Sequence, residues 1–166
     1  MDRIVLSLLV DNTSGVLSRV AGLFSRRGYN IESLTVGETA DPRYSRMTVV
    51  STGDQEILEQ IEKQLSKLED VRDIKELKPG HSVYRELIMV KVKADASQRQ
   101  AITAISDIFR ATIVDIGKES LTVMLTGDQS KLDALISLLE DYEILELART
   151  GITGLSRGAD DVRWLP

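Results

Sequence analysis

The string Thr52-Gly53-Asp54-Gln55 occurs a second time as Thr126-Gly127-Asp128-Gln129, 74 residues further along the chain. Apolar residues follow each copy at three- and four-residue spacing, which is typical of one face of a helix. They are Leu58, Ile61 and Leu65 after the first copy, and Leu132, Leu135 and Leu139 after the second. Asp54 and Asp128 each stand where an N-cap side chain accepts hydrogen bonds from free backbone amides. The sequence therefore predicts one helix after each copy, in two similar halves.

An earlier pair of helical faces matches at a spacing of 85 residues. The matched residues are Leu17, Val20, Leu23 and Phe24 in the first half, and Ile102, Ile105, Ile108 and Phe109 in the second. Because 85 exceeds 74 by 11, we expect the second half to be 11 residues shorter between its helices. The loop at residues 39–43 holds most of the extra length.

Each half follows the pattern strand, helix, strand, strand, helix, strand. Strands are expected near residues 2–10, 30–38, 44–52, 71–77, 83–93, 111–117, 120–126 and 143–149. Helices are expected near residues 15–28, 54–68, 97–110 and 129–141. Such a half closes as a four-stranded antiparallel sheet with two helices on one face. The prediction is an α+β chain of two tandem ferredoxin-like βαββαβ domains.

The domain boundaries follow from turn residues and composition. The predicted segments are an N-terminal domain at 1–78, a linker at 79–83, a C-terminal domain at 84–150 and a tail at 151–166. Pro79 and Gly80 mark the linker, and the glycines of the tail indicate a mobile extension. Leu87 and Met89 alternate with Ile88 and Val90, so their strand is apolar on both faces. This favours dimerisation or packing against a partner.

The composition excludes several classes of function. The chain has 166 residues, 42% of them apolar, so it can form a core; its net charge of −5 disfavours nucleic-acid binding. It has no cysteine and a single histidine, His81, which excludes thiolate catalysis, disulfides and multi-histidine metal sites. The longest apolar stretch near the start, Ile4 to Val10, is too short to span a bilayer, and Met1-Asp2-Arg3 lacks the basic flank of a signal peptide. We expect a soluble cytoplasmic protein without a membrane or nucleic-acid partner.

The loop at residues 11–17 carries the candidate site, because a strand ends there and a helix begins at once. Free backbone amides at the positive end of a helix dipole can hold a carboxylate. Gly15 lets a ligand approach the backbone, and the Asn12 amide can accept from an ammonium and donate to a carboxylate. These groups suit a zwitterionic amino acid. The alternative is that they are ordinary capping and turn residues.

The second half helps to decide between these two interpretations. At the 85-residue spacing, Ser97 stands opposite Asn12, and Gln100 stands opposite Gly15. The second half thus keeps the fold but lacks the glycine. A glycine present in only one copy of a duplicated fold favours a functional role.

Residues 11–24 and 27–34 resemble the ACT domain. With the further stretches 45–48, 60–65 and 154–158, nearly the whole chain resembles the small regulatory subunits of acetolactate synthase. The resemblance implies a regulatory chain with no catalytic residue, cofactor or metal of its own. It implies a partner, a catalytic large subunit that uses thiamine diphosphate, FAD and magnesium. The small subunit would activate this partner and confer feedback inhibition by a branched-chain amino acid, usually valine.

The resemblance also implies that the effector lies between two ACT domains of a homodimer. Asn12, Gly15 and Val16 would come from one chain. Asn30 and Ile31 would come from the other, with Val36 nearby. Asn30 would hold the effector by its amide, and Ile31 and Val36 would line the side-chain pocket. The second domain, which departs from the effector motif, would contact the catalytic subunit.

Two alternatives remain open. An ACT-type amino-acid sensor could regulate a different enzyme or a transcriptional partner. The βαββαβ fold also occurs in enzymes and RNA-binding modules. RNA-binding versions need aromatic side chains on the central strands, where this sequence has Leu8, Met47 and Val49.

Overall fold

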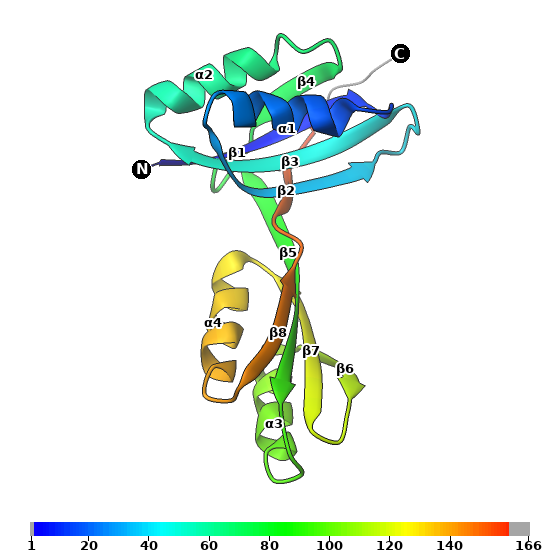
Figure 1. Ribbon diagram of the computed structural model, residues 1–166, viewed down its shortest axis with the longest axis vertical. Coiled ribbons are helices and arrows are strands. Elements are labelled where there is room, and N and C mark those ends of the chain that lie inside the picture. The colour runs from blue at the N-terminus through cyan, green and yellow to red at the C-terminus, as the bar shows by residue number, and fades with distance from the viewer. Residues whose placement is uncertain (1, 160–166) are drawn as a thin grey trace. The chain divides into compact units, whose positions relative to one another are not determined.

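The computed structural model describes residues 2–159, and the contacts within it divide the chain into two units (Figure 1). The first unit holds the described residues up to Val83 and those from Ile152 onward. The second unit runs from Tyr84 to Gly151. The predicted α+β class with two βαββαβ units is confirmed.

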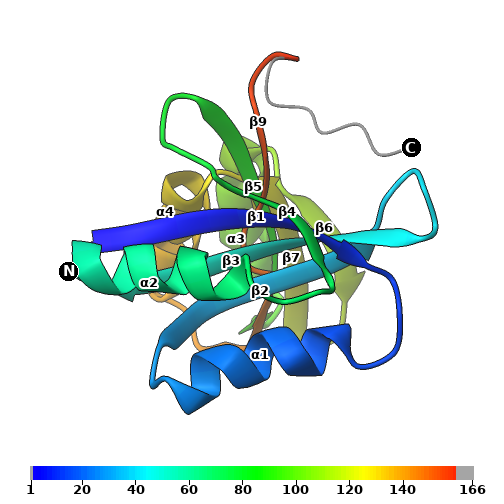
Figure 2. The same ribbon diagram turned by 90° about the horizontal axis from the view of Figure 1, so that it is seen from above.

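The first unit is a four-stranded antiparallel sheet in the order β2-β3-β1-β4. Its elements are β1 (Asp2–Asp11), α1 (Val16–Arg26), β2 (Asn30–Glu38), β3 (Tyr44–Gly53), α2 (Gln55–Leu65) and β4 (Val71–Glu76). Both helices lie on one face of the sheet (Figures 1 and 2). β2 and β4 are therefore the edge strands.

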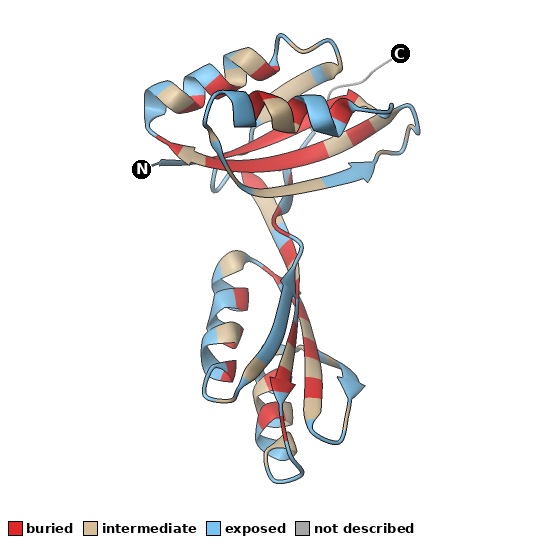
Figure 3. Cartoon of the chain, viewed as in Figure 1, coloured by how far each residue is buried: buried red, intermediate tan, exposed pale blue. Residues whose placement is uncertain are grey.

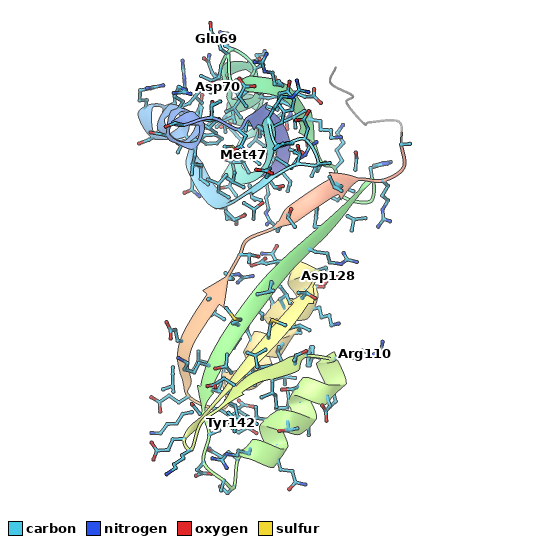
Figure 4. The ribbon with its side chains drawn as sticks, turned by 90° about the vertical axis from the view of Figure 1, so that its right-hand side faces the viewer. Met47, Glu69, Asp70, Arg110, Asp128 and Tyr142 are labelled. Carbon is cyan, nitrogen blue, oxygen red and sulfur yellow. The ribbon has the colours of Figure 1, made fainter. Side chains whose placement is uncertain are left out.

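The core of the first unit lies between the sheet and its two helices. Alternate residues of β1 point into it, among them Leu6 and Leu8, which are fully buried. Phe24 of α1 is also buried and meets Tyr29 edge to face, with ring centroids 6.3 Å apart. Met47 of β3, labelled in Figure 4, belongs to the same core. This packing fixes α1 against the sheet and so fixes the loop that precedes it.

The face of the first sheet opposite the helices is crossed by a strand that the sequence did not predict. β9 (Thr153–Ser156) contacts β3 and pairs with β5. The Thr35 hydroxyl donates to the carbonyl of Ile152 at 3.3 Å, and Lys75 Nζ donates to the Ser156 hydroxyl at 3.2 Å. The expectation of a mobile extension is therefore wrong for residues 153–156. Residues 160–166 of the expected tail lie outside the described residues.

The second unit repeats the arrangement with the order β6-β7-β5-β8, and β9 pairs with β5. Its elements are β5 (Ser82–Lys93), α3 (Arg99–Phe109), β6 (Thr112–Ile116), β7 (Ser120–Gly127), α4 (Gln129–Leu139) and β8 (Ile144–Arg149). Figure 3 shows its buried residues on the central strands and on the inner sides of the helices. β5 begins at Ser82, inside the segment expected as the linker.

The repeat is confirmed for α2 and α4, which begin 74 residues apart at Gln55 and Gln129. Asp54 accepts a hydrogen bond from the amide of Ile57 at 2.9 Å. Asp128, labelled in Figure 4, accepts from the amide of Lys131 at the same distance. Each aspartate thus caps its helix as predicted.

The spacing of 85 residues between α1 and α3 is wrong. Leu17 is 47% exposed, whereas its proposed match Ile102 is fully buried. The two helices match at 82 residues instead, because each is closed by the same hydrogen bond. Tyr29 N–H donates to Phe24 carbonyl in the first unit, and Ala111 N–H donates to Ser106 carbonyl in the second. The counterpart of Gly15 is therefore Ser97 rather than Gln100.

An RNA-binding module of this fold stacks bases on the face of its sheet that no helix covers. Leu8, Met47 and Val49 point into the core beneath the helices, so they could not stack on bases. The neighbouring positions on the opposite face of the two central strands include Ser7 and Val50, which are also not aromatic. The prediction that the central strands lack stacking side chains therefore rests on Ser7 and Val50, and not on Leu8, Met47 and Val49.

The expectation that one strand of the second unit is apolar on both faces holds for residues 87–90 of β5, whereas Lys91 and Lys93 follow on the helix-free face. Ile88 and Val90 are buried beneath the helices. Met89 points to the opposite face, where it is 41% exposed and pairs across the sheet with Met124.

Candidate functional site

The N-terminus of α1 is open. Its N-cap residue Gly15 has φ +86°, a left-handed conformation that side chains with a Cβ rarely adopt. No side chain caps the helix, and no acidic residue stands in its first turn. Within residues 2–159, no hydrogen bond uses the N–H of Gly15 or Val16. These amides lie at the positive end of the helix dipole, which favours an anion there.

The second unit closes the equivalent helix end with its own carboxylate. Asp95 Oδ1 accepts from the amides of Ser97 at 2.9 Å and Gln98 at 3.1 Å. The Ser97 hydroxyl also donates to this oxygen, and these hydrogen bonds lower the pKa of Asp95. At the 82-residue spacing, Ser97 and Gln98 are the counterparts of Gly15 and Val16. A carboxylate therefore sits in the second unit where the first unit leaves two amides free.

Asn12 lies beside this open end but has a structural task as well. Its Nδ2 donates to the carbonyl of Pro42 at 2.9 Å and to Glu38 Oε2 at 3.2 Å. Its backbone N–H donates to the carbonyl of Arg43 at 2.8 Å. The amide donors thus hold the loop between β2 and β3. Among the hydrogen bonds of residues 2–159, none uses Oδ1, so Asn12 can still accept from an ammonium group.

Arg19 and Asp70 also belong to this region, and sequence reasoning missed both. Arg19 Nε donates to Asp70 Oδ2 at 2.5 Å, and Arg19 Nη2 lies 3.4 Å from the carbonyl of Ser14. A Cβ on Gly15 would lie 2.8 Å from Arg19 Nη1. Hydrogen bonding to Arg19 lowers the pKa of Asp70, labelled in Figure 4. No local pattern could reveal this pair, because its members are 51 residues apart.

A second ion pair ties the same loop to β4. Arg72 donates to both carboxylate oxygens of Asp11, from Nε at 2.7 Å and from Nη2 at 3.0 Å. The backbone N–H of Asp11 also donates to the carbonyl of Asp70 at 2.9 Å. The loop between β1 and α1 is therefore held from two sides before any ligand arrives.

The six residues predicted for the site do not all meet within one chain. Val16 is buried in the core, so only its backbone N–H is available. Val36 is 46% exposed and pairs with Met47, toward the end of the sheet where β1 leads into Asn12. Asn30 and Ile31 lie at the other end of β2, where Asn30 pairs with Thr52. The 11 residues of α1, about 16 Å of helix, separate the two groups.

The described residues hold neither a cluster of side chains suited to a metal ion nor a helix long and apolar enough to cross a membrane. The candidate site is thus built from backbone amides, one amide side chain and the Arg19–Asp70 ion pair, in a loop that the Arg72–Asp11 pair ties to β4. Such groups can bind a small zwitterion, and they include no nucleophile next to a base.

The known proteins that resemble this chain fall in one family. The family described as the AHAS small subunit-like ACT domain matches residues 6–73, and the small subunit of acetolactate synthase matches residues 85–158. A probable acetolactate synthase small subunit from Methanothermobacter thermautotrophicus is 52% identical over 159 residues, 95% of each chain. The acetolactate synthase isozyme 3 small subunit of Escherichia coli is 51% identical over 157 residues, 94% of this chain and 96% of that protein.

A solved structure extends the likeness to the fold. The acetolactate synthase small subunit from Thermotoga maritima superposes with a TM-score of 0.88 at 40% identity, covering 96% of this chain and 99% of that one. The resemblance seen in the sequence is therefore confirmed over nearly the whole chain. The chain belongs to the acetolactate synthase small-subunit family and carries the ACT regulatory domain of that family.

Proposed function

We propose that this chain is a non-catalytic, cytoplasmic regulator of the acetolactate synthase catalytic large subunit. It activates that subunit and makes it sensitive to feedback inhibition by valine or another branched-chain amino acid. The observation that carries the proposal is the open N-terminus of α1 at Gly15, in a chain whose second unit fills the same place with Asp95. Thiamine diphosphate, FAD and magnesium belong to the catalytic partner in this proposal.

The effector's carboxylate binds the amides of Gly15 and Val16. Gly15 suits this role because it adopts a φ of +86° and leaves room for Arg19 Nη1, which lies 2.8 Å from where a Cβ would be. The ammonium group donates a hydrogen bond to Asn12 Oδ1, which is free because Asn12 holds the loop through Nδ2, bonded to the carbonyl of Pro42. The branched side chain then lies toward Val36, whose exposed surface is at the same end of the sheet.

The remaining contacts come from a second copy of the chain. β2 is an edge strand, so its free backbone groups can pair with β2 of another protomer around a two-fold axis. In an antiparallel pair centred between Ser33 and Leu34, Asn30 of one chain lies opposite Gly37 of the other. This register brings Asn30 and Ile31 beside the partner's open helix end. The proposed site is therefore complete only in a dimer.

The second unit serves contact with the catalytic subunit. Asp95 already accepts from the amides of Ser97 and Gln98, the counterparts of Gly15 and Val16, so these two amides are not open to an effector. The helix-free face carries Met89 and Met124 beside the Lys91–Glu146 ion pair, and methionine side chains adapt to varied partner surfaces.

The test is reconstitution with the large subunit of acetolactate synthase. We expect co-purification, higher acetolactate production than the large subunit gives alone, and inhibition of that gain by valine, leucine or isoleucine. Failure to bind or activate the large subunit contradicts the proposal. Amino-acid binding without any effect on the synthase indicates a sensor for a different target instead.

A further inference from the structure

We infer that Arg19 binds the carboxylate of the effector through its Nη1 group, and that Asp70 positions Arg19 for this contact. The inference rests on the proposed function, because it assumes an amino acid at the open end of α1. It adds to that proposal a charged recognition residue and the reason why the ligand must carry a free carboxylate.

Two of the guanidinium nitrogens of Arg19 contact the protein, and the third lies at the N-terminus of α1. Nε is used by Asp70 and Nη2 approaches the carbonyl of Ser14. Nη1 has no hydrogen bond within residues 2–159, and it lies 2.8 Å from where a Cβ of Gly15 would be. A guanidinium holds its donors in a rigid fork, so fixing Nε also fixes the direction of Nη1. Nη1, which has no hydrogen-bond partner within the described residues, therefore lies beside the amides of Gly15 and Val16.

Asp70 is suited to hold the guanidinium in place. Its side chain is only 18% exposed, whereas that of Arg19 is 51% exposed. Its backbone is anchored, since its carbonyl accepts from the amide of Asp11 at 2.9 Å. The contact with Arg19 keeps the pKa of Asp70 low, so the carboxylate stays ionised at neutral pH. A preorganised arginine loses little side-chain freedom when the ligand binds.

The start of α3 in the second unit can be compared with the start of α1, because the two are counterparts. At the 82-residue spacing, the counterpart of Arg19 is Ala101, which is exposed. There the amides of Ser97 and Gln98 are served by Asp95, and the guanidinium of Arg99 in the first turn donates to the carbonyls of Gly117 and Lys118. An arginine at the position of Arg19 and two open amides occur together in the first unit, and both are missing from the second.

The experiment measures the affinity of the full-length chain for L-valine and for L-valinamide by calorimetry. In wild type, valine should bind more tightly than valinamide. Arg19→Gln should weaken valine binding by about tenfold or more, the usual loss for a charge-assisted hydrogen bond. Valinamide affinity should change little, so the preference for the carboxylate collapses. Asp70→Asn should also reduce the preference for valine over valinamide, whereas Asp70→Glu, which keeps the carboxylate, should retain it.

Arg72→Gln is the matched control. It breaks the ion pair between Arg72 and Asp11 in the same loop, and that pair does not involve Nη1 of Arg19. We expect it to keep the preference for valine over valinamide. The assignment is overturned if Arg19→Gln retains that preference, or if it weakens both ligands equally. A wild-type chain that binds no valine contradicts the proposed effector site itself, a result distinct from either of these.

Discussion

The carboxylate of Asp95 caps the backbone amide of Ser97 at 2.9 Å, and in residues 2–159 no side chain does the same for Gly15. The two residues are counterparts in the two halves of one duplicated fold. A helix end without a side-chain acceptor leaves its amides for water or a ligand. In the proposed function, the first unit binds an external carboxylate where the second unit has an internal one.

Asp95→Ala should destabilise the second unit without changing valine binding. The pKa of Asp95 is lowered by the Ser97 hydroxyl and by two backbone amides, so its ionised form stabilises the fold. That contribution is present above the ordinary carboxyl pKa of about 4 and is lost as the pH falls through the lowered value. Urea unfolding should show a lower midpoint for the variant at pH 7, and the difference should shrink below about pH 4. A loss of valine affinity in this variant contradicts the assignment of the site to the first unit.

Gly15→Asp should abolish feedback inhibition while leaving activation largely intact. The new carboxylate would meet Arg19 Nη1 and supply internally what the effector supplies from outside. The left-handed φ of +86° makes the substitution cost about 1–2 kcal/mol of stability. The measurement is acetolactate production by the reconstituted complex across a valine titration.

Gly80→Asp is the matched control for that variant. Gly80 has φ +81° and open space where its Cβ would be, so it carries similar backbone strain away from the site. We expect this control to retain valine sensitivity. Normal sensitivity in Gly15→Asp would place the effector elsewhere.

The sequence predicts the order of the elements well, because most of them are set by local patterns. Asp54 and Asp128 each combine a capping side chain with a helical face that follows it, and both helices begin where expected. The match of α1 with α3 failed because Leu17 is apolar yet exposed, so it was paired with the buried Ile102. The apolar character of a residue alone does not show whether its side chain is exposed or buried.

The candidate site could be predicted only in part. Gly15 and Asn12 lie in the loop between a predicted strand and a predicted helix, so the sequence predicts that they are close to each other. The contact between Arg19 and Asp70 depends on how the start of β4 meets the loop after β1, which no local pattern encodes. β9 was missed because four residues with one glycine show no clear periodicity.

Arg110→Gly should stabilise the second unit. Arg110, labelled in Figure 4, ends α3 with φ +58° and is the only described residue other than glycine with positive φ. Its counterpart Gly28 closes α1 with φ +68°. Relief of the left-handed conformation should raise the free energy of unfolding by about 1 kcal/mol. Urea denaturation checks the sign, and an unchanged or lower midpoint contradicts the assigned strain.

Removal of residues 152–166 should expose the helix-free face of the first sheet. Val5 and Val50 lie on that face and are 7% and 0% exposed, and β9 crosses it. We expect the truncated chain to bind more of an apolar fluorescent dye and to unfold at lower urea concentration. A chain lacking only residues 160–166 keeps β9 and serves as the control. Equal behaviour of the two truncations contradicts a covering role for β9.

Each proposed effector site takes residues from two chains, so a mixture of two variants that do not bind valine should regain valine binding. Gly15→Asp damages the helix end, and Asn30→Ala removes the amide proposed to come from the partner. In a mixed dimer one site carries both changes and the other carries neither. After subunit exchange, calorimetry should recover roughly a quarter of the wild-type valine sites, because half of the dimers are mixed and each keeps one site. If exchange is verified and the mixture binds no more valine than its parents, the two-chain site is wrong.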